Sequence, residues 1–494
     1  MKWALLSVWD KTGIIDFAQD LILQKYNIMS SGGTGKELSL AGIKFTEVSS
    51  YTGFPEMMDG RVKTLHPKVH GGLLGRQQID DAVMAKYGIN RIDLLIVNLY
   101  PFEQMAGRNL SLEAMTEYID IGGPAMIRAA AKNYKNVAVV VNPSDYPIVG
   151  HAIRDGGISL ELRLSLAKKA FARTAAYDAA ISNYLFGINE HFPSTLTVQF
   201  NHGRGLRYGE NPHQEASVYG DKGIAGVEPV QGKQMSYNNY LDVNAGVALL
   251  REFEEPAAVI VKHNNPCGVA VGNDLLDAYI TAREVDPASS YGSVVCLNRQ
   301  IGEKEAEEIN STFVEVVISP SLTKEARKVM AKKENMRVLI LPQKCESDEI
   351  RTIDGGVLVQ RTPPYREHWN VITDRDPTPD EMHAIQLAWK VCKHTKSNTI
   401  IFADQKHTLG IGAGQMSRVD SAKIAIDKAR TSLNGSVMAS DAFLPFPDTL
   451  EIAAEAGATA IVQPGGSIRD QEVIDAANRL HLAMIFTRIR YFRH

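Results

Sequence analysis

The sequence predicts an α/β protein whose amino-terminal part is built on a parallel sheet. Short apolar runs alternate with longer amphipathic stretches, and the apolar runs end in polar or glycine-containing turns. Hydrophobic residues make up 44% of the 494 residues and charged residues 22%, as in an ordinary globular protein. Strands separated by helical stretches of this length form parallel sheets covered by helices on both faces.

The amino-terminal elements follow this alternation in order. Expected in turn are a strand at 3–9 (WALLSVW), a helix at 14–26 (IIDFAQDLILQKY), a strand and glycine turn at 27–33 (NIMSSGG), and strands within 92–102 (IDLLIVNLYPF) and 136–143 (NVAVVVNP). Ligands of parallel sheets collect at the carboxyl ends of the strands. The turns SSGGTGK, NLYPF and NPSDY all follow apolar runs, so we expect them to rim one crevice.

The remainder of the chain predicts a helix-rich segment and then a second strand-and-turn system. The helical stretch runs from about Leu160 to Glu190, and residues 191–205 have the mixed polar, Pro and Gly character of a domain boundary. This predicts domains at 1–195 and 200–494. Two later segments, 257–272 and 398–415, each run from an apolar strand into a Gly-containing turn, which suggests two similar subdomains joined within the Pro-rich stretch 342–380.

Composition excludes several classes of function. The 53 Lys and Arg residues nearly balance 57 Asp and Glu residues, giving a net charge of -4, so we expect no nucleic-acid partner. No apolar run approaches the roughly 18 residues of a membrane span, and the apolar start is too short for a signal peptide. The four cysteines lie far apart, which fits a reducing cytoplasm and argues against structural zinc or disulfides.

A dense group of cationic side chains stands out within residues 59–72. Arg61, Lys63, His66, Lys68 and His70 lie within ten residues, between glycines, in a slightly acidic protein. Like charges at this density repel unless an anion binds, and Arg and Lys are the usual partners of phosphate. The alternative is a solvated charged loop. Pro67 and the paired glycines favour an anion-binding site.

Two further amino-terminal motifs bear on the ligand. The segment SSGGTGKE (30–37) resembles a P-loop only superficially, because Ser30 and Glu37 replace the residues that a triphosphate site requires. A glycine turn opening onto a helix still suits a monophosphate. In residues 119–134, Gly-Gly-Pro opens a helix, with Asp120 just before it and Lys132 four residues after Arg128. These are either a capping Asp with solvated cations or a buried Asp–Lys pair that holds a polar ring.

The segment 262–268 (KHNNPCG) predicts a second site. It follows a fully apolar strand, so its side chains emerge at a strand end. The adjacent Lys262 penalises a protonated imidazole and keeps His263 neutral and available as a base. A zinc deaminase is the rival interpretation, but Cys267 has no second cysteine at the required spacing and no H-x-E motif lies nearby.

Other polar turns could complete this second site. Residues 206–214 and 233–245 place amides, arginine and aromatic groups in turns, and 440–448 (SDAFLPFPD) adds aromatic and proline residues. Phe443, Pro445 and Phe446 could form a slot for a flat heterocycle, or simply a Pro-braced hydrophobic turn.

Taken together, these motifs closely resemble the bifunctional purine biosynthesis family that is both AICAR transformylase and IMP cyclohydrolase. The resemblance covers essentially the whole chain. In order, it rests on SVWDKTG, SSGGT, DGRVKTLHPKVHGGLL, NLYPF, IDIGGPAMIRAAAKN, LRYGENPHQ, KHNNPCG, DPASSYG, GAGQMSRVDSA, SDAFLPFPD, QPGGSIRDQEVI and RIRYFRH. It implies a methylglyoxal-synthase-like amino-terminal domain and a transformylase region of two cytidine-deaminase-like subdomains without zinc. It also implies a cytoplasmic homodimer whose transformylase sites are completed across the subunit interface.

The resemblance implies roles for particular residues in ring closure of the formamido ribotide FAICAR to IMP. By this resemblance, the residues that catalyse ring closure are Lys63, Tyr100, Asp120 and Lys132. Lys63 would stabilise the developing oxyanion, and Lys132 with Asp120 would manage protons at the carboxamide. The ribotide phosphate would be bound by Ser7, Lys11, Ser31, Gly33 and Thr34, with Arg61 and Thr64 nearby.

The resemblance also implies how a formyl group passes from 10-formyltetrahydrofolate to AICAR. His263 would remove the amine proton, Lys262 would keep His263 neutral, and Asn398 would bind the tetrahedral oxygen. Arg207 and Tyr208 would bind AICAR. The folate or the ribotide pocket would involve Phe443, Pro445, Phe446 and Asp448, with Glu315, Arg418, Arg490 and Phe492 as weaker assignments.

Three departures from the family pattern lie in the carboxy-terminal pocket: Arg488 where Gly is common, Tyr491 where His is frequent, and Leu444 where an aromatic is common. The family needs no catalytic metal, although it sometimes carries potassium. A catalytically silent ribotide-binding sensor is the alternative from another class. The presence of Lys63, Lys132, Lys262, His263 and Asn398 disfavours it, because binding alone does not need them all.

Overall fold

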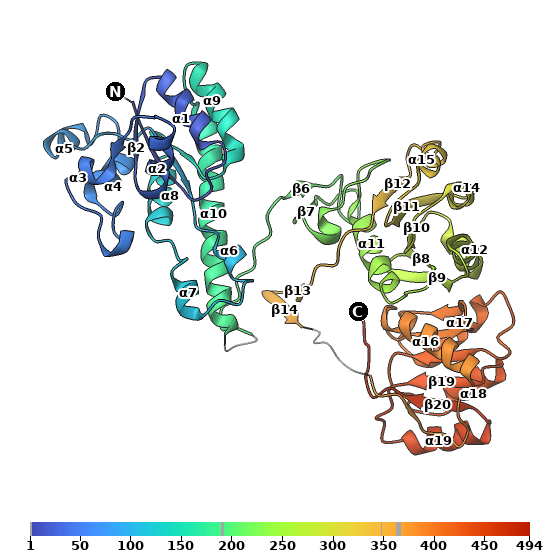
Figure 1. The fold of residues 1–494 in the computed structure, drawn as a ribbon. Helices are drawn as coiled ribbons and strands as arrows, with labels where there is room; N and C mark the ends of the chain where they lie inside the picture. The colour runs from blue at the N-terminus through green and yellow to red at the C-terminus, as the bar shows by residue number, and fades with distance from the viewer. Residues whose placement is uncertain (1, 189–191, 347, 362–366) are drawn as a thin grey trace. The chain divides into compact units, whose positions relative to one another are not determined.

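The computed structural model describes residues 2–188, 192–346, 348–361 and 367–494 and divides the chain into two compact units (Figure 1). Unit 1 is Met1–Gln199 and unit 2 is Phe200–His494. The sequence-based boundary stretch begins at His191, which lies outside the described residues. No helix within the described ranges is long and apolar enough to cross a membrane.

Unit 1 contains a parallel sheet, as the sequence predicted, and its five strands have the order β3-β2-β1-β4-β5. Its strands are β1 (Lys2–Val8), β2 (Tyr26–Ser30), β3 (Thr46–Glu47), β4 (Leu94–Asn98) and β5 (Ala138–Val140). Its helices are α1 (Ile14–Leu23), α2 (Gly32–Leu40), α3 (Val48–Thr52), α4 (Pro67–Leu74), α5 (Asp81–Lys86), α6 (Phe102–Met105), α7 (Leu112–Thr116), α8 (Gly122–Lys132), α9 (Tyr146–Arg154) and α10 (Leu160–Gly187). Short 3₁₀ turns occupy Met58–Gly60 and Pro143–Asp145.

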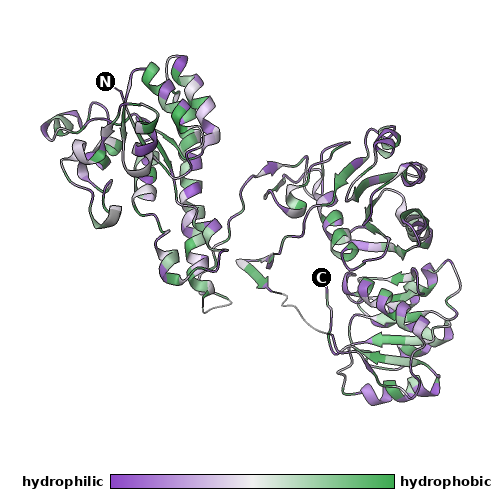
Figure 2. Ribbon diagram, viewed as in Figure 1, coloured by the Kyte–Doolittle hydropathy of each residue, from purple (hydrophilic) through white to green (hydrophobic). Residues whose placement is uncertain are grey.

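Alternation along the strands gives this sheet a core on each face. Leu5 and Leu95 belong to the apolar cluster shared with α8 and α10, whereas Leu6 and Ile96 belong to the cluster shared with α1 and α9. Successive strand side chains point to opposite faces, so a sheet covered on both sides needs apolar residues at nearly every position. Figure 2 shows this as hydrophobic strands flanked by helices with hydrophilic outer faces.

Unit 2 contains two mixed sheets that repeat one topology. The first has the order β12-β11-β10-β8-β9, and the second adds a short edge strand to the corresponding order β15-β20-β19-β18-β16-β17. In both, an antiparallel hairpin is followed by a strand antiparallel to its first arm and then by two parallel strands. The expectation of two similar subdomains agrees with this repetition.

The elements of unit 2 have the following bounds. The strands of the first sheet are β8 (Ala257–Lys262), β9 (Asn265–Val271), β10 (Ser293–Leu297), β11 (Val314–Ser319) and β12 (Arg337–Ile340). Those of the second are β15 (Asn370–Val371), β16 (Ile400–Ala403), β17 (Thr408–Gly412), β18 (Val437–Ser440), β19 (Ala460–Gln463) and β20 (Ala483–Phe486). Small pairs are β6 (Arg204–Gly205) with β7 (Ser217–Val218), and β13 (Glu349–Ile353) with β14 (Gly356–Gln360). The helices are α11 (Tyr237–Leu250), α12 (Leu275–Val285), α13 (Pro287–Ser290), α14 (Glu303–Asn310), α15 (Lys324–Met330), α16 (Pro379–Lys393), α17 (Arg418–Lys428), α18 (Asp448–Glu455) and α19 (Asp470–Arg479), and a 3₁₀ turn spans Gly223–Gly226.

Two of the glycines expected to lie in turns after β8 and β16 lie within strands instead, whereas Gly414 follows β17 with a φ of 68°. Gly268 is in β9 and Gly412 in β17. A Cβ at Gly268 would lie 1.9 Å from the carbonyl oxygen of Ala282, and one at Gly412 would lie 1.8 Å from that of Ser421. These glycines therefore allow α12 and α17 to pack directly on their strands. The sequence pattern predicts a strand followed by a turn, whereas each segment folds as a hairpin.

The connection between the two subdomains includes an exposed hairpin. Within the predicted connection 342–380, β13 and β14 pair antiparallel and are solvent-exposed over nearly their whole length. Residues 347 and 362–366 of this stretch lie outside the described part. Unlike the strands of the two larger sheets, the hairpin contributes nothing to either core.

Candidate active sites

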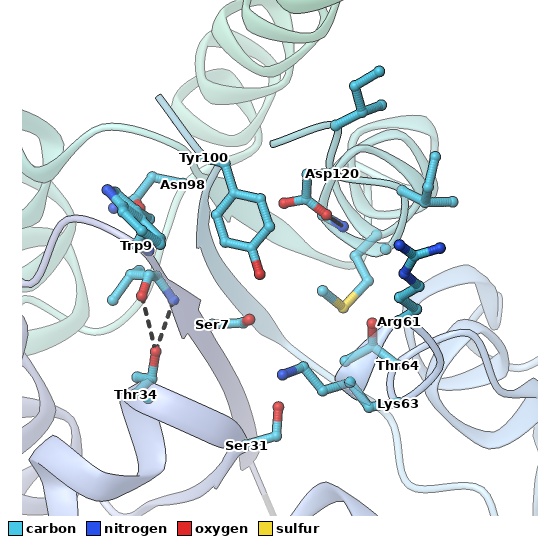
Figure 3. A pocket seen from close by; sticks show the side chains of 18 of the residues that line it. Ser7, Trp9, Ser31, Thr34, Arg61, Lys63, Thr64, Asn98, Tyr100 and Asp120 are labelled. Atoms are coloured by element: carbon cyan, nitrogen blue, oxygen red, sulfur yellow. Dashed lines mark hydrogen bonds between the residues drawn. The ribbon is translucent and has the colours of Figure 1, made fainter. Parts of the chain in front are cut away.

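A pocket of about 700 Å³ opens at the carboxyl ends of β1 and β4 in unit 1 (Figure 3). Ser7 lies near the end of β1, and Asn98 ends β4. The pocket also receives residues from the start of α2, from the segment after the 3₁₀ turn Met58–Gly60, and from the start of α8. It is therefore the crevice expected from the strand-end turns, except that the turn 142–146 does not line it.

The amino end of α2 forms a polar cradle in this pocket. Ser31 precedes the helix in an extended conformation, and its buried hydroxyl has no hydrogen-bond partner. Thr34 Oγ1 accepts a bond from the N–H of Val8 at 2.9 Å, and Lys11 donates to the carbonyl of Val8. Free N–H groups, a helix dipole and a nearby lysine together suit a phosphate.

Lys63 reaches into the pocket from the opposite side. Its Nζ lies 3.7 Å from Oε1 of Glu56. A Cβ placed on Gly32 would lie 2.9 Å from the same Nζ, so a side chain there would displace the lysine. Gly32 also has a φ of 55°, which favours glycine. In Figure 3 the Lys63 ammonium and the Ser31 hydroxyl point into the same cavity.

Asp120 and Tyr100 form the third side of the pocket. Asp120 Oδ1 accepts the N–H of Gly123 at 2.8 Å, so its carboxylate caps the first turn of α8 and also faces the cavity. Burial raises the pKa of Asp120, while the Gly123 N–H and Lys63 oppose the shift. Burial, then Asp120 and Glu56, raises the pKa of Tyr100. Both groups are thereby biased towards their protonated forms.

Lys132 does not lie in this pocket. It ends α8, whereas Asp120 precedes the start of that helix, so the two ends are roughly 15 Å apart along the helix axis. Lys132 instead lines a second, more apolar hollow of about 720 Å³ with His70, Arg128 and Phe171. The expected Asp120–Lys132 pair is therefore not formed within one chain, because residues twelve apart cannot meet on a straight helix.

The cationic group at 61–70 does not converge on one ligand either. Arg61 pairs with Glu117 at the pocket rim, and Lys63 enters the pocket. Lys68 lies over the ring of Tyr51, and His66 accepts the N–H of Lys68. Of the five cationic side chains, two line the pocket of Figure 3, and the prediction of one shared anion was too broad.

Pocket residues that sequence reasoning missed include Trp9 and Asn98. Asn98 Oδ1 accepts the N–H groups of Trp9 and Asp10 at 2.6 and 2.8 Å. It thereby fixes the loop that carries Lys11. Trp9 contacts the ring of Tyr100 edge-on, with centroids 5.1 Å apart. Asn98 is the first residue of the motif NLYPF. The available signal for it in the sequence was a polar residue that directly ends a buried strand.

The second candidate site lies where the two sheets of unit 2 meet. The backbone of β9 bonds that of the β17 hairpin, with the N–H of Val271 donating to Lys406. A hollow of about 310 Å³ at this junction is lined by Lys262, His263, Asp286 and Gln415, among others. Lys262 Nζ donates to the carbonyl of Tyr291 at 2.6 Å. His263 is exposed to this hollow at the tip of the β8–β9 hairpin.

Asn398 reaches the same junction from the other subdomain. Its side-chain amide donates to the carbonyls of Gln415 and Met416 at 3.0 and 3.1 Å. The N–H of Lys396 donates to Asn265 Oδ1 at 3.0 Å, which ties the loop carrying Asn398 to the hairpin carrying His263. Asn398 itself does not line the hollow.

A separate polar group surrounds Arg207 and Tyr208. The Arg207 guanidinium lies 4.7 Å from the Tyr208 ring centroid and donates to its hydroxyl. Both contribute to the electrostatic environment of Arg337, which lies 3.3 Å from Glu315. Burial lowers the pKa of Arg337, with Glu315 opposing. Arg207, Tyr208 and Glu315 are thus neighbours of one buried arginine that sequence reasoning did not identify.

The carboxy-terminal segment gathers around Asp441, another residue that was missed. Asp441 is fully buried, pairs with Arg418 at 3.4 Å, and accepts a hydrogen bond from Ser397. Arg418 and Arg490 lie over the Phe492 ring, at 5.9 and 4.3 Å from its centroid. The signal in the sequence was an aspartate that directly follows a buried strand.

The Phe443–Asp448 turn places Leu444 in the core and leaves its two phenylalanines at the surface. Phe443 and Phe446 are exposed, with Arg469 lying over the Phe446 ring, and Asp448 begins α18. Leu444 is completely buried, so this departure from the family pattern changes the core and not the pocket surface. Phe443, Pro445, Phe446 and Asp448 do not line the His263 hollow.

The other two departures also have physical accounts. Arg488 has a φ of 60°, the left-handed region that glycine adopts freely, which explains why glycine suits this position. Tyr491 donates to Glu367 Oε1 at 2.9 Å and thereby joins the polar cluster around Lys393.

Across the described ranges there is no group of three or more His, Cys, Asp or Glu residues able to hold a metal ion. Burial raises the pKa of Cys267 to about 12.

Comparison with known proteins places this chain in a family. The model of the AICARFT/IMPCHase bienzyme matches residues 130–428, which is more than half of the chain, and the model of the MGS-like domain matches residues 13–125. The chain belongs to the AICARFT/IMPCHase bienzyme family. This confirms the resemblance and the fold class, an MGS-like amino-terminal domain followed by the AICARFT/IMPCHase region.

A solved structure described as ForH is also similar in sequence. It is 37% identical over 38% of this chain and 97% of its own, with a TM-score of 0.35.

Membership of the AICARFT/IMPCHase family indicates a bifunctional role in purine biosynthesis.

Proposed function

We propose that this AICARFT/IMPCHase family member catalyses the last two steps of IMP synthesis. It would transfer a formyl group from 10-formyltetrahydrofolate to AICAR and then close the ring of FAICAR with loss of water. The observation that supports this best is the unit 1 pocket, where a cradle at the start of α2 faces Lys63 and Asp120. In the proposal the phosphate of the ribotide lies at the cradle, beside Lys63 Nζ, and its base lies towards Asp120.

Ring closure needs the carboxamide nitrogen of FAICAR to attack its own formyl carbon. The formyl oxygen gains negative charge, and the Lys63 ammonium is placed to stabilise it. Tyr100, whose raised pKa favours its protonated form, can deliver a proton to the departing water, and Asp120 faces the same cavity. Because the reaction is intramolecular, orientation of the ribotide supplies much of the rate enhancement.

Formyl transfer needs the AICAR amine to attack the formyl carbon of the folate. In the proposal His263 accepts the amine proton, Asn398 hydrogen-bonds the oxygen of the tetrahedral intermediate, and the carbon–nitrogen bond to the folate then breaks. Lys262 lies in the same hollow as His263, and in the proposal Arg207 and Tyr208 hold AICAR. The unit 2 junction supports this by tying the His263 hairpin to the Asn398 loop.

The proposed enzyme is a homodimer with transformylase sites completed across the interface. A partner chain would also account for Lys132, which lies outside the pocket of its own chain. In this proposal Lys132 reaches the FAICAR pocket of the second copy. The family relationship supports a dimer, and the exposed position of Lys132 at a helix end is compatible with such a reach.

The test is to mix the purified protein with AICAR and 10-formyltetrahydrofolate and to follow tetrahydrofolate and IMP separately. We expect both products. Formation of neither product, with AICAR bound, would instead identify a ribotide sensor. His263→Ala should abolish tetrahydrofolate release but leave closure of supplied FAICAR intact, and joint loss in the folded variant would contradict two separate sites.

A further inference from the structure

The turn that carries His263 has an unusual backbone. Lys262 pairs with Asn265 across the β8–β9 hairpin, so His263 and Asn264 form a two-residue loop. Both have positive φ values, 53° and 64°. Tight hairpin turns of this kind favour Asn-Gly or Gly-Gly, because residues with a side chain resist the left-handed region. The sequence His-Asn therefore needs support from its surroundings to hold this shape.

Asp242 supplies a contact that can hold the turn. Its Oδ1 accepts the backbone N–H of Asn264 at 2.6 Å. Its environment also includes the backbone N–H and the side chain of His263. Burial raises the pKa of Asp242, and the bonds and charge from Asn264 and His263 oppose that shift. A half-buried carboxyl aimed at two consecutive N–H groups is a strong tether for a loop.

The helix that carries Asp242 is itself fixed. Ser236 and Asn239 form a capping box at the start of α11, and Asn239 Nδ2 also bonds Glu315. At Gly246 a Cβ would lie 2.5 Å from Cys296 Sγ, so α11 packs directly on β10. A capped helix that packs on the sheet thus fixes the position of Asp242. The hydrogen bond from the turn to Asp242 is therefore anchored to the core of the subdomain.

We propose that Asp242 is a positioning residue for formyl transfer, acting by holding the His263–Asn264 turn in the left-handed conformation that presents the imidazole. This inference rests on the proposed function of the unit 2 site and adds a residue that touches neither substrate. It also gives a function to the 233–245 motif. None of the roles suggested for other residues explains this motif. Without the tether, the turn relaxes towards negative φ and the imidazole moves away from the amine.

The test compares three changes in the full-length protein: Asp242→Ala, Asp242→Asn, and Asp242→Ala combined with Asn264→Gly. Asp242→Ala should lower kcat for formyl transfer about 100-fold with little change in KM for AICAR, since misplacement of about 1 Å has such an effect. Asp242→Asn keeps an acceptor oxygen and should stay within about threefold of wild type. Adding Asn264→Gly should restore most of the activity, because glycine adopts positive φ without the tether.

Controls separate this inference from the proposed function. Asn264→Gly alone should be nearly as active as wild type, and every variant should close the ring of supplied FAICAR at the wild-type rate. Absence of formyl transfer in the wild type would overturn the proposed function and this inference with it. An active wild type with an equally active Asp242→Ala, no rescue by Asn264→Gly, or an Asp242→Asn loss as large as that of Asp242→Ala would overturn the tether alone.

Discussion

The backbone N–H of Lys396 donates a 3.0 Å hydrogen bond to the side-chain Oδ1 of Asn265, and this bond links the two subdomains of unit 2. Asn265 begins β9 directly after the His263–Asn264 turn, and Lys396 lies two residues before Asn398. This amide side chain is thus the direct link between the turn that carries the proposed base and the loop that carries the proposed oxyanion ligand.

Removal of this link should impair formyl transfer specifically. In Asn265→Ala the Lys396 N–H loses its acceptor, and we expect kcat for formyl transfer to fall about 10-fold or more, as for other small misplacements of catalytic groups. Asn265→Asp retains an acceptor oxygen and serves as the matched control. Steady-state kinetics with AICAR and 10-formyltetrahydrofolate would measure both, and equal loss in the two variants would argue against a positioning role.

Ser31→Ala should affect ligand binding and leave stability unchanged. Its buried hydroxyl has no partner in the free protein, so removing it breaks no hydrogen bond. We expect an unchanged Tm and a KM for FAICAR raised about 10-fold, the equivalent of one hydrogen bond to a charged group. Thr34→Val is the contrasting variant. Its hydroxyl satisfies the N–H of Val8, so this change should lower the Tm.

Asp120→Asn should stabilise unit 1 at neutral pH while abolishing ring closure. Burial raises the pKa of Asp120 in the folded state, so the ionised carboxylate destabilises the fold at pH 7. Below the unfolded pKa of about 4 the group is protonated in both states and its stabilising contribution is fully present. That contribution is lost as pH rises through the folded pKa.

The measurement is thermal unfolding of wild type and Asp120→Asn at pH 7 and below pH 4. The advantage of the variant should appear at pH 7 and vanish in acid. The amide retains an oxygen for the Gly123 N–H, so the cap is preserved. Lower stability of the variant at pH 7 would show that the charge pairs favourably in the pocket.

Glu252→Gln should destabilise unit 2, with the opposite pH dependence. Burial opposes ionisation of Glu252, but His394 and Lys393 at 3.0 Å outweigh it and lower the pKa of Glu252 to about 2. This stabilisation is present above the unfolded pKa of about 4.3 and is lost as pH falls through about 2. Because this pair is only partly buried, the loss should be smaller than the roughly 3 kcal/mol of a fully buried pair, and urea unfolding at pH 7 would measure it. An unchanged midpoint would contradict the assignment.

Lys132 should act only through a second copy of the chain. If so, Lys63→Ala and Lys132→Ala would each be inactive in ring closure, but co-refolded mixtures would regain about a quarter of wild-type activity. Half of the dimers would be mixed, and each would hold one intact site in a two-fold arrangement. No recovery on mixing, with dimers present, would mean that the lysine does not act across subunits.

Helices and strands were predictable from the sequence where the periodicity and the length of an apolar pattern determined the type of element. The strands around Leu5, Leu95 and Val139 followed from uninterrupted apolar runs, and α1 and α10 from long amphipathic ones. The two-residue strand β3 left no such pattern. The sequence predicts turns at the glycines of β9 and β17, but the structure places these glycines where a helix packs closely on the strand. Close helix packing and tight turns both favour glycine, so the sequence alone does not distinguish them.

The candidate sites were only partly predictable for a related reason. Ser7, Asn98 and Lys262 emerge at strand ends, which a sequence pattern can locate. Asp441 also follows a buried strand, but its partner Arg418 and the partner of Asp242, Asn264, lie more than twenty residues away, and no local pattern reports such pairs. The position of Lys132 depends on helix length alone and was predictable in principle.

The repeated sheet topology of unit 2 has a consequence for how its chemistry is divided. A duplicated scaffold offers two equivalent hairpin tips and two equivalent strand entrances. The first copy places His263 at a hairpin tip, and the second places Asn398 just before the entrance of the equivalent strand. The two proposed groups therefore come from different places in the repeated topology, so neither subdomain by itself would hold the complete proposed centre, and a circularly permuted chain that kept both junction contacts would retain it.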